Sequence, residues 1–130
     1  MDMPVNDKCM TPPKVILICL PFIPPSFNRV VGRNEWEYRE QKKRITEHVR
    51  LLALQHRPKT PIDKAEVTIR YYFPDARRRD PDNYSGKFLL DGLTKAGIIV
   101  DDSFQHITLK LEAEIDKKNP RTELWIKEAQ

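Results

Sequence analysis

The sequence predicts a single small domain of the mixed α+β class, with a mixed sheet, two main helices and the element order βαβαββ. Three observations support this prediction. The chain has 130 residues, a length that suits one hydrophobic core rather than two. Several short segments alternate apolar with polar residues, as strands do, and two longer segments repeat apolar residues at helical spacing. The chain contains no internal repeats and no low-complexity segments.

The first half of the chain supplies one strand and one helix. The short apolar run 15–20 ends at a proline, as expected of a strand that is covered on both faces or lies centrally in a sheet. Further prolines favour an extended passage through residues 21–29. A helix is expected from Asn34, which can cap it together with Glu37, until Pro58. Its apolar face consists of Tyr38, Ile45, Val49 and Leu52.

The second half supplies three strands and the other helix. Residues 65–73 alternate and end before a proline, which predicts a half-buried strand. We expect a helix at about 84–96, followed by a glycine in the position of a C-terminal cap. The alternation at 107–115 and a shorter run at 122–127 predict the last two strands. The apolar stripe of the helix consists of Leu89, Leu93 and Ala96.

Composition excludes several classes of protein. With a mean hydropathy of −0.62 and 32% charged residues, no segment is apolar enough to cross a bilayer, so we expect a cytoplasmic protein without a membrane partner. Cys9 and Cys19 are too few for a disulfide framework or a zinc site, and we interpret both as free thiols. Residues 1–13 contain three prolines, which favours a flexible leader before a domain at 14–130.

Positive charge is concentrated in one segment of the chain. The chain has 23 basic and 19 acidic residues, and residues 33–59 alone have eight basic and four acidic ones, which accounts for the whole excess of +4. Such an excess attracts a polyanion, because each neutralised phosphate releases a counterion. We therefore expect nucleic acid as the partner, contacted by Lys42, Lys43 and Arg44. The alternative is that these charges only keep an exposed helix face soluble.

Carboxylates and guanidinium groups follow the strand at 65–73. Asp80 and Asp82 flank a proline that favours extended geometry, so both can point the same way and offer oxygen ligands to Mg²⁺ or Mn²⁺. Asp101 and Asp102 form a second acidic pair beyond the next helix, and a metal site requires the two loops to approach each other. A divalent ion there would polarise a phosphate and activate water. The basic residues expected to meet the phosphate are Arg77, Arg78, Arg79 and Lys87.

Each of these acidic groups also has a purely structural interpretation. The pair 82–83 can cap the following helix, because Asp and Asn are preferred capping residues. Asp91 lies four residues from both Lys87 and Lys95, so an exposed row of ion pairs would explain it. The pair 101–102 can form an ordinary turn. The sequence alone leaves these alternatives open.

Three motifs together resemble the RusA family of Holliday-junction resolvases, which are Mg²⁺-dependent endonucleases. The resemblance covers about residues 15–127. It rests on PPSFNR at 24–29, on RRRDPDN at 77–83, and on DGLTKAG at 91–97 followed by DD at 101–102. Any one of these motifs alone would be weak, and the combination is specific.

The resemblance implies which residues form the site. Asp80, Asp82 and Asp102 correspond to the metal-binding aspartates, with Asp101 beside them, and Lys87 corresponds to the essential lysine. Compared with the family, one extra residue separates Asp82 from Lys87. If it lies before the helix, Lys87 keeps its place, whereas within the helix it would turn Lys87 by about 100°. The other DNA contacts that we expect are Asn28 and Arg29.

The functional hypothesis is an Mg²⁺-dependent, structure-selective endonuclease that resolves Holliday junctions and other branched DNA in recombination and repair. Two matched cuts are needed to resolve a four-way junction, and the chain offers one acidic cluster, so we expect a homodimer. One alternative is a protein that binds DNA junctions without cutting them. A weaker alternative is a metal-dependent enzyme for nucleotides or small phosphoesters, which would not need the positive charge at 33–59.

Overall fold

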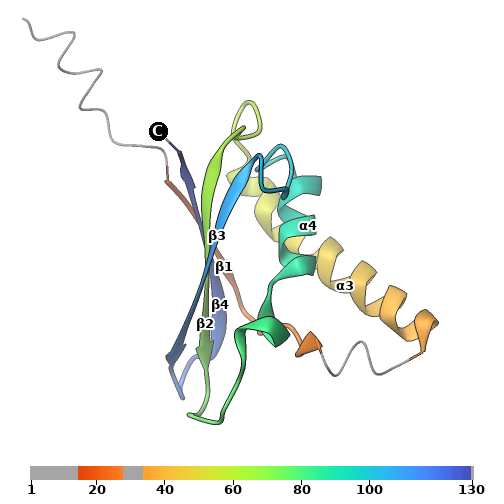
Figure 1. Ribbon diagram of the computed structural model, residues 1–130, viewed down its shortest axis with the longest axis vertical. Coiled ribbons are helices and arrows are strands. Elements are labelled where there is room, and N and C mark those ends of the chain that lie inside the picture. Colours follow the sequence, from red (N-terminus) through yellow and green to blue (C-terminus); the bar gives the residue numbers. More distant parts are fainter. Residues whose placement is uncertain (1–14, 28–33, 130) are drawn as a thin grey trace, which may run out of the picture.

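A four-stranded sheet forms one layer of the computed structural model and the helices form a second layer against one face of it (Figure 1). The structure describes residues 15–27 and 34–129. The strands are β1 (Val15–Leu20), β2 (Ala65–Phe73), β3 (Ile107–Ile115) and β4 (Arg121–Glu128). The longer helices of the described residues are α3 (Glu35–Ala53) and α4 (Lys87–Lys95), and short 3₁₀ turns occupy Leu54–His56 and Pro81–Tyr84. The predicted class, a single small mixed α+β domain, is confirmed.

The sheet is mixed and has the spatial order β1-β4-β2-β3. β4 pairs antiparallel with both β1 and β2, whereas β2 and β3 are parallel. Parallel neighbours need a crossover connection, and here α4 supplies it. The crossover places the loop after β2 at one end of α4 and the turn before β3 at the other, so these two acidic segments are separated by the length of a helix.

Two predicted details are wrong. The strand β1 is not covered on both faces, since it lies at the sheet edge and the side chains of Val15 and Cys19 are exposed. The reason is that the helices cover one face of the sheet only (Figure 1). The second helix does not begin near residue 84, because Pro81–Tyr84 forms a separate 3₁₀ turn and α4 starts at Lys87.

The helix α3 begins as the sequence predicts. Asn34 caps it, and its Oδ1 accepts a hydrogen bond from the backbone N–H of Glu37 at 2.8 Å. Ile45 and Val49 are buried on its inner face. No helix in the described parts of the chain has an apolar stretch long enough to span a bilayer.

The core lies between the helix layer and the inner face of the sheet, and α3 crosses α4 very closely there. Gly92 of α4 makes this approach possible, because a Cβ at that position would lie 2.6 Å from the Cβ of Val49. Any larger residue would push the helices apart and open the core. The largest fully buried core side chains include Ile18, Leu20, Ile69, Leu89, Leu93, Ile98, Leu124 and Ile126.

Several predictions fall on residues outside the described part of the chain. These are the flexible leader at 1–13 with its Cys9, and the DNA contacts Asn28 and Arg29. They remain predictions.

Candidate functional site

The loop after β2 is organised by Arg79, which sequence reasoning had assigned to phosphate. Its guanidinium donates hydrogen bonds to Asp75 Oδ1 at 2.9 Å and to the carbonyl oxygens of Asp75 and Arg77 at 3.0 and 3.1 Å. It also lies 4.2 Å from the ring centroid of Phe73. Only 17% of the Arg79 side chain is exposed. The donors of Arg79 are therefore engaged in holding the loop.

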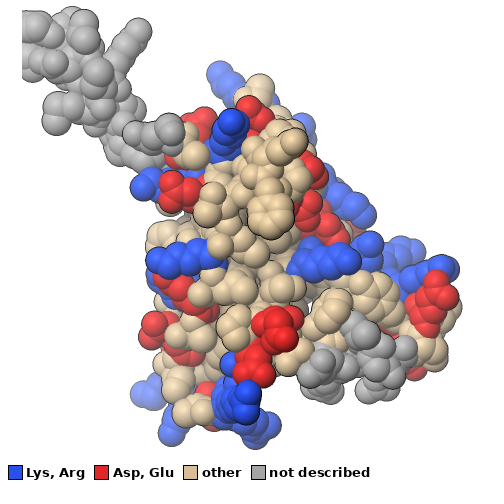
Figure 2. Space-filling model, in the orientation of Figure 1, with Lys and Arg blue, Asp and Glu red and all other residues tan. Residues whose placement is uncertain are grey.

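The other two arginines of this loop remain accessible while balancing its carboxylates. The side chains of Arg77 and Arg78 are 79% and 88% exposed, and Arg78 Nε lies 3.2 Å from Asp80 Oδ1. The backbone N–H of Arg77 and the guanidinium of Arg79 hold the pKa of Asp75 below its ordinary value. The carboxylates of Asp75 and Asp80 are thus already paired with guanidinium groups of the same loop. Figure 2 shows basic side chains gathered at the end of the sheet where this loop lies.

Asp80 and Asp82 stand at the start of the 3₁₀ turn Pro81–Tyr84. The backbone of Asp80 is extended, with φ −102° and ψ 139°, as the following proline predicts. The turn is attached to β2, because the hydroxyl of Tyr71 donates to the carbonyl oxygen of Tyr84 at 2.7 Å. Burial raises the pKa of Tyr71, so this hydroxyl keeps its proton. The two carboxylates therefore sit on a firmly placed turn.

Gly86, and not the pair 82–83, occupies the capping position of α4. Its φ of 79° is left-handed, and a Cβ there would collide with Cδ1 of Ile69. The extra residue in the spacing between Asp82 and Lys87 consequently lies before the helix. Lys87 is the first residue of α4 and is exposed.

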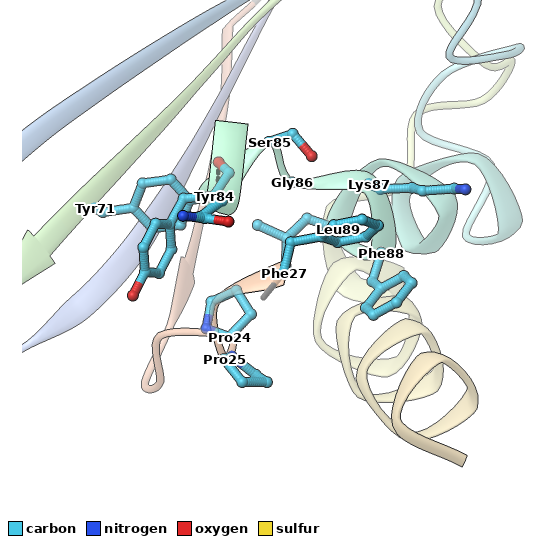
Figure 3. Close-up of a pocket in the computed structure, with 11 residues that line it drawn as sticks. Pro24, Pro25, Phe27, Tyr71, Tyr84, Ser85, Gly86, Lys87, Phe88 and Leu89 are labelled. Atoms are coloured by element: carbon cyan, nitrogen blue, oxygen red, sulfur yellow. Dashed lines mark hydrogen bonds between the residues drawn. The ribbon is translucent and has the colours of Figure 1, made fainter. Parts of the chain in front are cut away.

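Beside Lys87 lies a small apolar cavity of about 30 Å³ that the sequence did not indicate. Figure 3 shows Lys87 extending away from this cavity, while Pro24, Tyr84 and Phe88 surround it. The cavity joins the first motif to the loop after β2, which are distant in sequence. The residues around the cavity pack against the start of α4, and the Lys87 ammonium group takes no part in this packing.

The second acidic pair lies in a turn that is pinned to the segment before β2. The backbone N–H of Ile62 donates to the carbonyl oxygen of Ile98 at 2.9 Å, and the N–H of Val100 donates to Ile62 at 3.1 Å. After the pair, the carbonyl oxygen of Ser103 accepts hydrogen bonds from the N–H groups of residues 106 and 107. Asp101 and Asp102 are held between these anchors.

Asp91 approaches this pair from the middle of α4. The pKa of Asp102 is raised, first by partial burial and then by the negative charges of Asp91 and Asp101. Among the described residues, Asp91 forms no ion pair with Lys87 or Lys95, so the predicted row of ion pairs is absent. Sequence reasoning missed this role, although Asp91 is the first residue of the third motif. We call Asp91, Asp101 and Asp102 the turn carboxylates, and Asp75, Asp80 and Asp82 the loop carboxylates.

The structure does not gather the loop and turn carboxylates around one point. Within residues 15–27 and 34–129, no three acidic, histidine or cysteine side chains are arranged to share a metal ion. Carboxylate oxygens are the donors that Mg²⁺ prefers, so the chemistry of the turn carboxylates suits this ion while the number of converging ligands falls short. The assignment of Mg²⁺ to Asp80, Asp82, Asp101 and Asp102 stays a prediction.

The basic segment predicted to contact DNA lies on α3. Figure 2 shows lysine and arginine side chains along this helix, interspersed with acidic ones. Lys42 and Lys43 line a groove between α3 and α4. Arg44 is exposed and lies outside the set of residues that line the groove.

Comparisons of the chain with models of protein families and with curated proteins find no match.

Proposed function

We propose that the protein is an Mg²⁺-dependent endonuclease that acts on branched DNA, in the manner of the Holliday-junction resolvases whose motifs it resembles. The observation that carries the proposal is the environment of Asp102. Its charge is disfavoured by burial and by two neighbouring carboxylates. A divalent cation relieves such repulsion and favours the ionised form of the carboxylates, which is the form that binds a metal.

The proposal assigns a task to each group of residues. Asp102 and Asp101 hold an ion at the turn, and Asp80 and Asp82 offer metal ligands at the loop on the other side of α4. Bound Mg²⁺ would supply a polarised phosphate and an activated water. Lys87, exposed at the start of α4, stabilises negative charge on the phosphate.

The DNA itself is held by positive charge outside the acidic groups. Arg77 and Arg78 are the exposed cations of the loop after β2, and α3 contributes further lysines and arginines. In this proposal these charges position the backbone and carry no preference for sequence. The protein works in the cytoplasm as a homodimer, so that two identical sites face the two strands to be cut. Sedimentation that shows only monomer at micromolar concentration would contradict the dimer.

A second candidate is a junction-binding protein without catalysis. The observation in its favour is that the described residues do not bring three potential ligands together. Such a protein would use the same basic surface and would need neither Lys87 nor the turn carboxylates.

One gel separates the two candidates. A labelled four-way junction and a plain duplex of the same sequence are incubated with the protein in Mg²⁺ or in EDTA. We expect paired cuts in the junction with Mg²⁺ only, and a shifted but intact junction in EDTA. Equal shifts in both buffers without any cut would favour the binding protein, and the absence of a shift would overturn both candidates.

A further inference from the structure

A groove of about 410 Å³ runs between α3 and α4. Its walls come from both helices, so it exists only because α4 folds back against α3. The lining residues are Arg39, Lys42, Lys43, Thr46 and Glu47 of α3 and Lys95 of α4. We call it the interhelical groove.

Positive charge in the interhelical groove exceeds negative charge, and most of it has no counter-charge. Its single carboxylate, Glu47, is engaged by Arg50, whose Nε lies 2.9 Å from each carboxylate oxygen. In the described part of the chain, neither lysine of α3 in the groove has an ion-pair partner, and neither has Lys95. Lys95 acts on Glu47 only at longer range, as a minor contribution that lowers its pKa. Three ammonium groups are thus available to an anion.

Thr46, which lines the groove, has a buried hydroxyl. Thr46 is 3% exposed, yet among the described residues its Oγ1 has no hydrogen-bond partner. Threonines in helices usually bond the carbonyl oxygen one turn earlier, as Thr94 does to Leu90 at 3.0 Å. A buried hydroxyl without a partner is destabilising, so an acceptor atom that reached it would gain a hydrogen bond.

Thr46 lies where α3 and α4 meet. A Cβ on Gly92 would lie 3.0 Å from the backbone carbonyl oxygen of Thr46, so the two helices touch at this residue. Lys95 follows Gly92 by less than one turn of α4. Its ammonium group therefore comes from the opposite wall to the lysines of α3.

We propose that the interhelical groove binds a phosphate group of a DNA backbone. The Thr46 hydroxyl donates a hydrogen bond to a phosphate oxygen, and Lys42, Lys43 and Lys95 neutralise its charge. A phosphate fits because it combines diffuse negative charge with several acceptor oxygens. Lys95 lies one helical turn beyond Asp91, so the groove and one of the turn carboxylates share the helix α4. This inference rests on the proposed function in that it takes DNA as the source of the phosphate.

The test compares groove variants with a matched lysine outside the groove. We choose Thr46→Val, Lys95→Gln and the double variant Lys42→Gln/Lys43→Gln, with Lys64→Gln as the control at an exposed position before β2. Binding to a fluorescent four-way junction and to a duplex is measured by anisotropy in EDTA over a series of KCl concentrations. Thermal unfolding of every variant is measured with and without inorganic phosphate.

The expected results separate a binding role from a structural one. Lys95→Gln weakens binding by about fivefold and lowers the slope of log affinity against log salt by about one. Thr46→Val weakens binding by about threefold, although it removes an unpaired buried hydroxyl and so leaves the melting temperature unchanged or raised. Lys64→Gln binds like the parent. Inorganic phosphate raises the melting temperature of the parent more than that of Thr46→Val.

Each failure has a separate signature. Groove variants that bind DNA as tightly as the parent would overturn this inference and leave the proposed function standing. A parent protein that binds no DNA would overturn the proposed function and the DNA phosphate with it. In that case stabilisation of the parent, but not of Thr46→Val, by inorganic phosphate would identify the groove as a site for free anions.

Discussion

The loop carboxylates and the turn carboxylates have opposite surroundings. In the loop after β2, the carboxylate of Asp75 accepts hydrogen bonds from Arg79, and that of Asp80 from Arg78. In the turn before β3, Asp102 faces the carboxylates of Asp91 and Asp101. The pKa of Asp75 is lowered as a result, whereas that of Asp102 is raised.

This difference shows where a cation would have the larger effect. Asp75 and Asp80 of the loop already interact with guanidinium groups, so a metal ion has to compete with arginine there. The turn carboxylates repel one another, so a metal ion removes an unfavourable interaction. An acidic cluster that lacks counter-charge within its own fold indicates a binding site more strongly than one that is already neutralised.

The largest expected effect separates the two groups by function. Asp102→Asn should reduce junction cleavage in Mg²⁺ by about a hundredfold or more, because a metal ligand is lost, while binding in EDTA stays close to that of the parent.

The same variant also tests stability. The fold disfavours the charge of Asp102, so the contribution of this group to stability is present at low pH and lost as pH rises through its raised pKa. The neutral variant should therefore be at least as stable as the parent at pH 7.

Glu114→Gln is the control for this experiment, since Glu114 is an exposed carboxylate of β3 outside both groups. It should cut and unfold like the parent. Full cleavage by Asp102→Asn would show that the turn carboxylates hold no catalytic metal.

The second effect concerns the position of the loop carboxylates. Gly86→Ala combines a left-handed φ with a collision against Ile69 and should lower the free energy of unfolding by about 2–3 kcal/mol. Gly97→Ala is matched, because its φ of 81° is also left-handed but the atoms nearest to its new Cβ belong to the Arg57 side chain, the closest at 3.2 Å. It should cost about 1 kcal/mol. Equal costs in urea denaturation would show that Ile69 can move aside.

A smaller effect is expected from the hydrogen bond that attaches the 3₁₀ turn to β2. Tyr71→Phe leaves the carbonyl oxygen of Tyr84 without this donor and should cost about 1–2 kcal/mol at pH 7. Because the pKa of Tyr71 is raised in the fold, its contribution is complete below the ordinary tyrosine pKa of about 10 and is lost at higher pH. The parent should therefore lose more stability than Tyr71→Phe between pH 9 and pH 11, as measured by urea denaturation at each pH. An identical loss in both proteins would contradict a buried, protonated Tyr71.

The smallest effect is a direct test of the opposite surroundings. In a carbon-13 NMR titration of the aspartate carboxyl groups, Asp75 should titrate below the ordinary value of about 3.9 and Asp102 above it. Asp91→Asn should lower the pKa of Asp102, since one like charge is removed, and should leave Asp75 unchanged. A midpoint of Asp102 that does not respond to Asp91→Asn would show that the two side chains lie farther apart in solution.

Much of the fold follows from local patterns. Apolar alternation located β2 and β3, a short run after a proline located β4, and the Asn34 cap and its apolar face located α3, because these signals act within a few residues. The same reasoning located β1 but not its place in the sheet, because an apolar run in an edge strand looks like one in a central strand. It also failed at the start of α4, where a 3₁₀ turn and a glycine cap interrupt a pattern that fits a longer helix.

The sequence by itself determined which segments become strands and helices and which short stretches carry the acidic and basic groups, because backbone preferences and side-chain periodicity are local properties. Only the tertiary structure decided the partners of those groups. It placed Asp91 near Asp102 instead of pairing it with the lysines of its own helix. It directed the Arg79 guanidinium toward the loop that contains it, and it set Lys95 across the groove from Lys42 and Lys43. These outcomes depend on how α4 folds back between β2 and β3, and electrostatic energies follow distances in space that spacing along the chain does not specify.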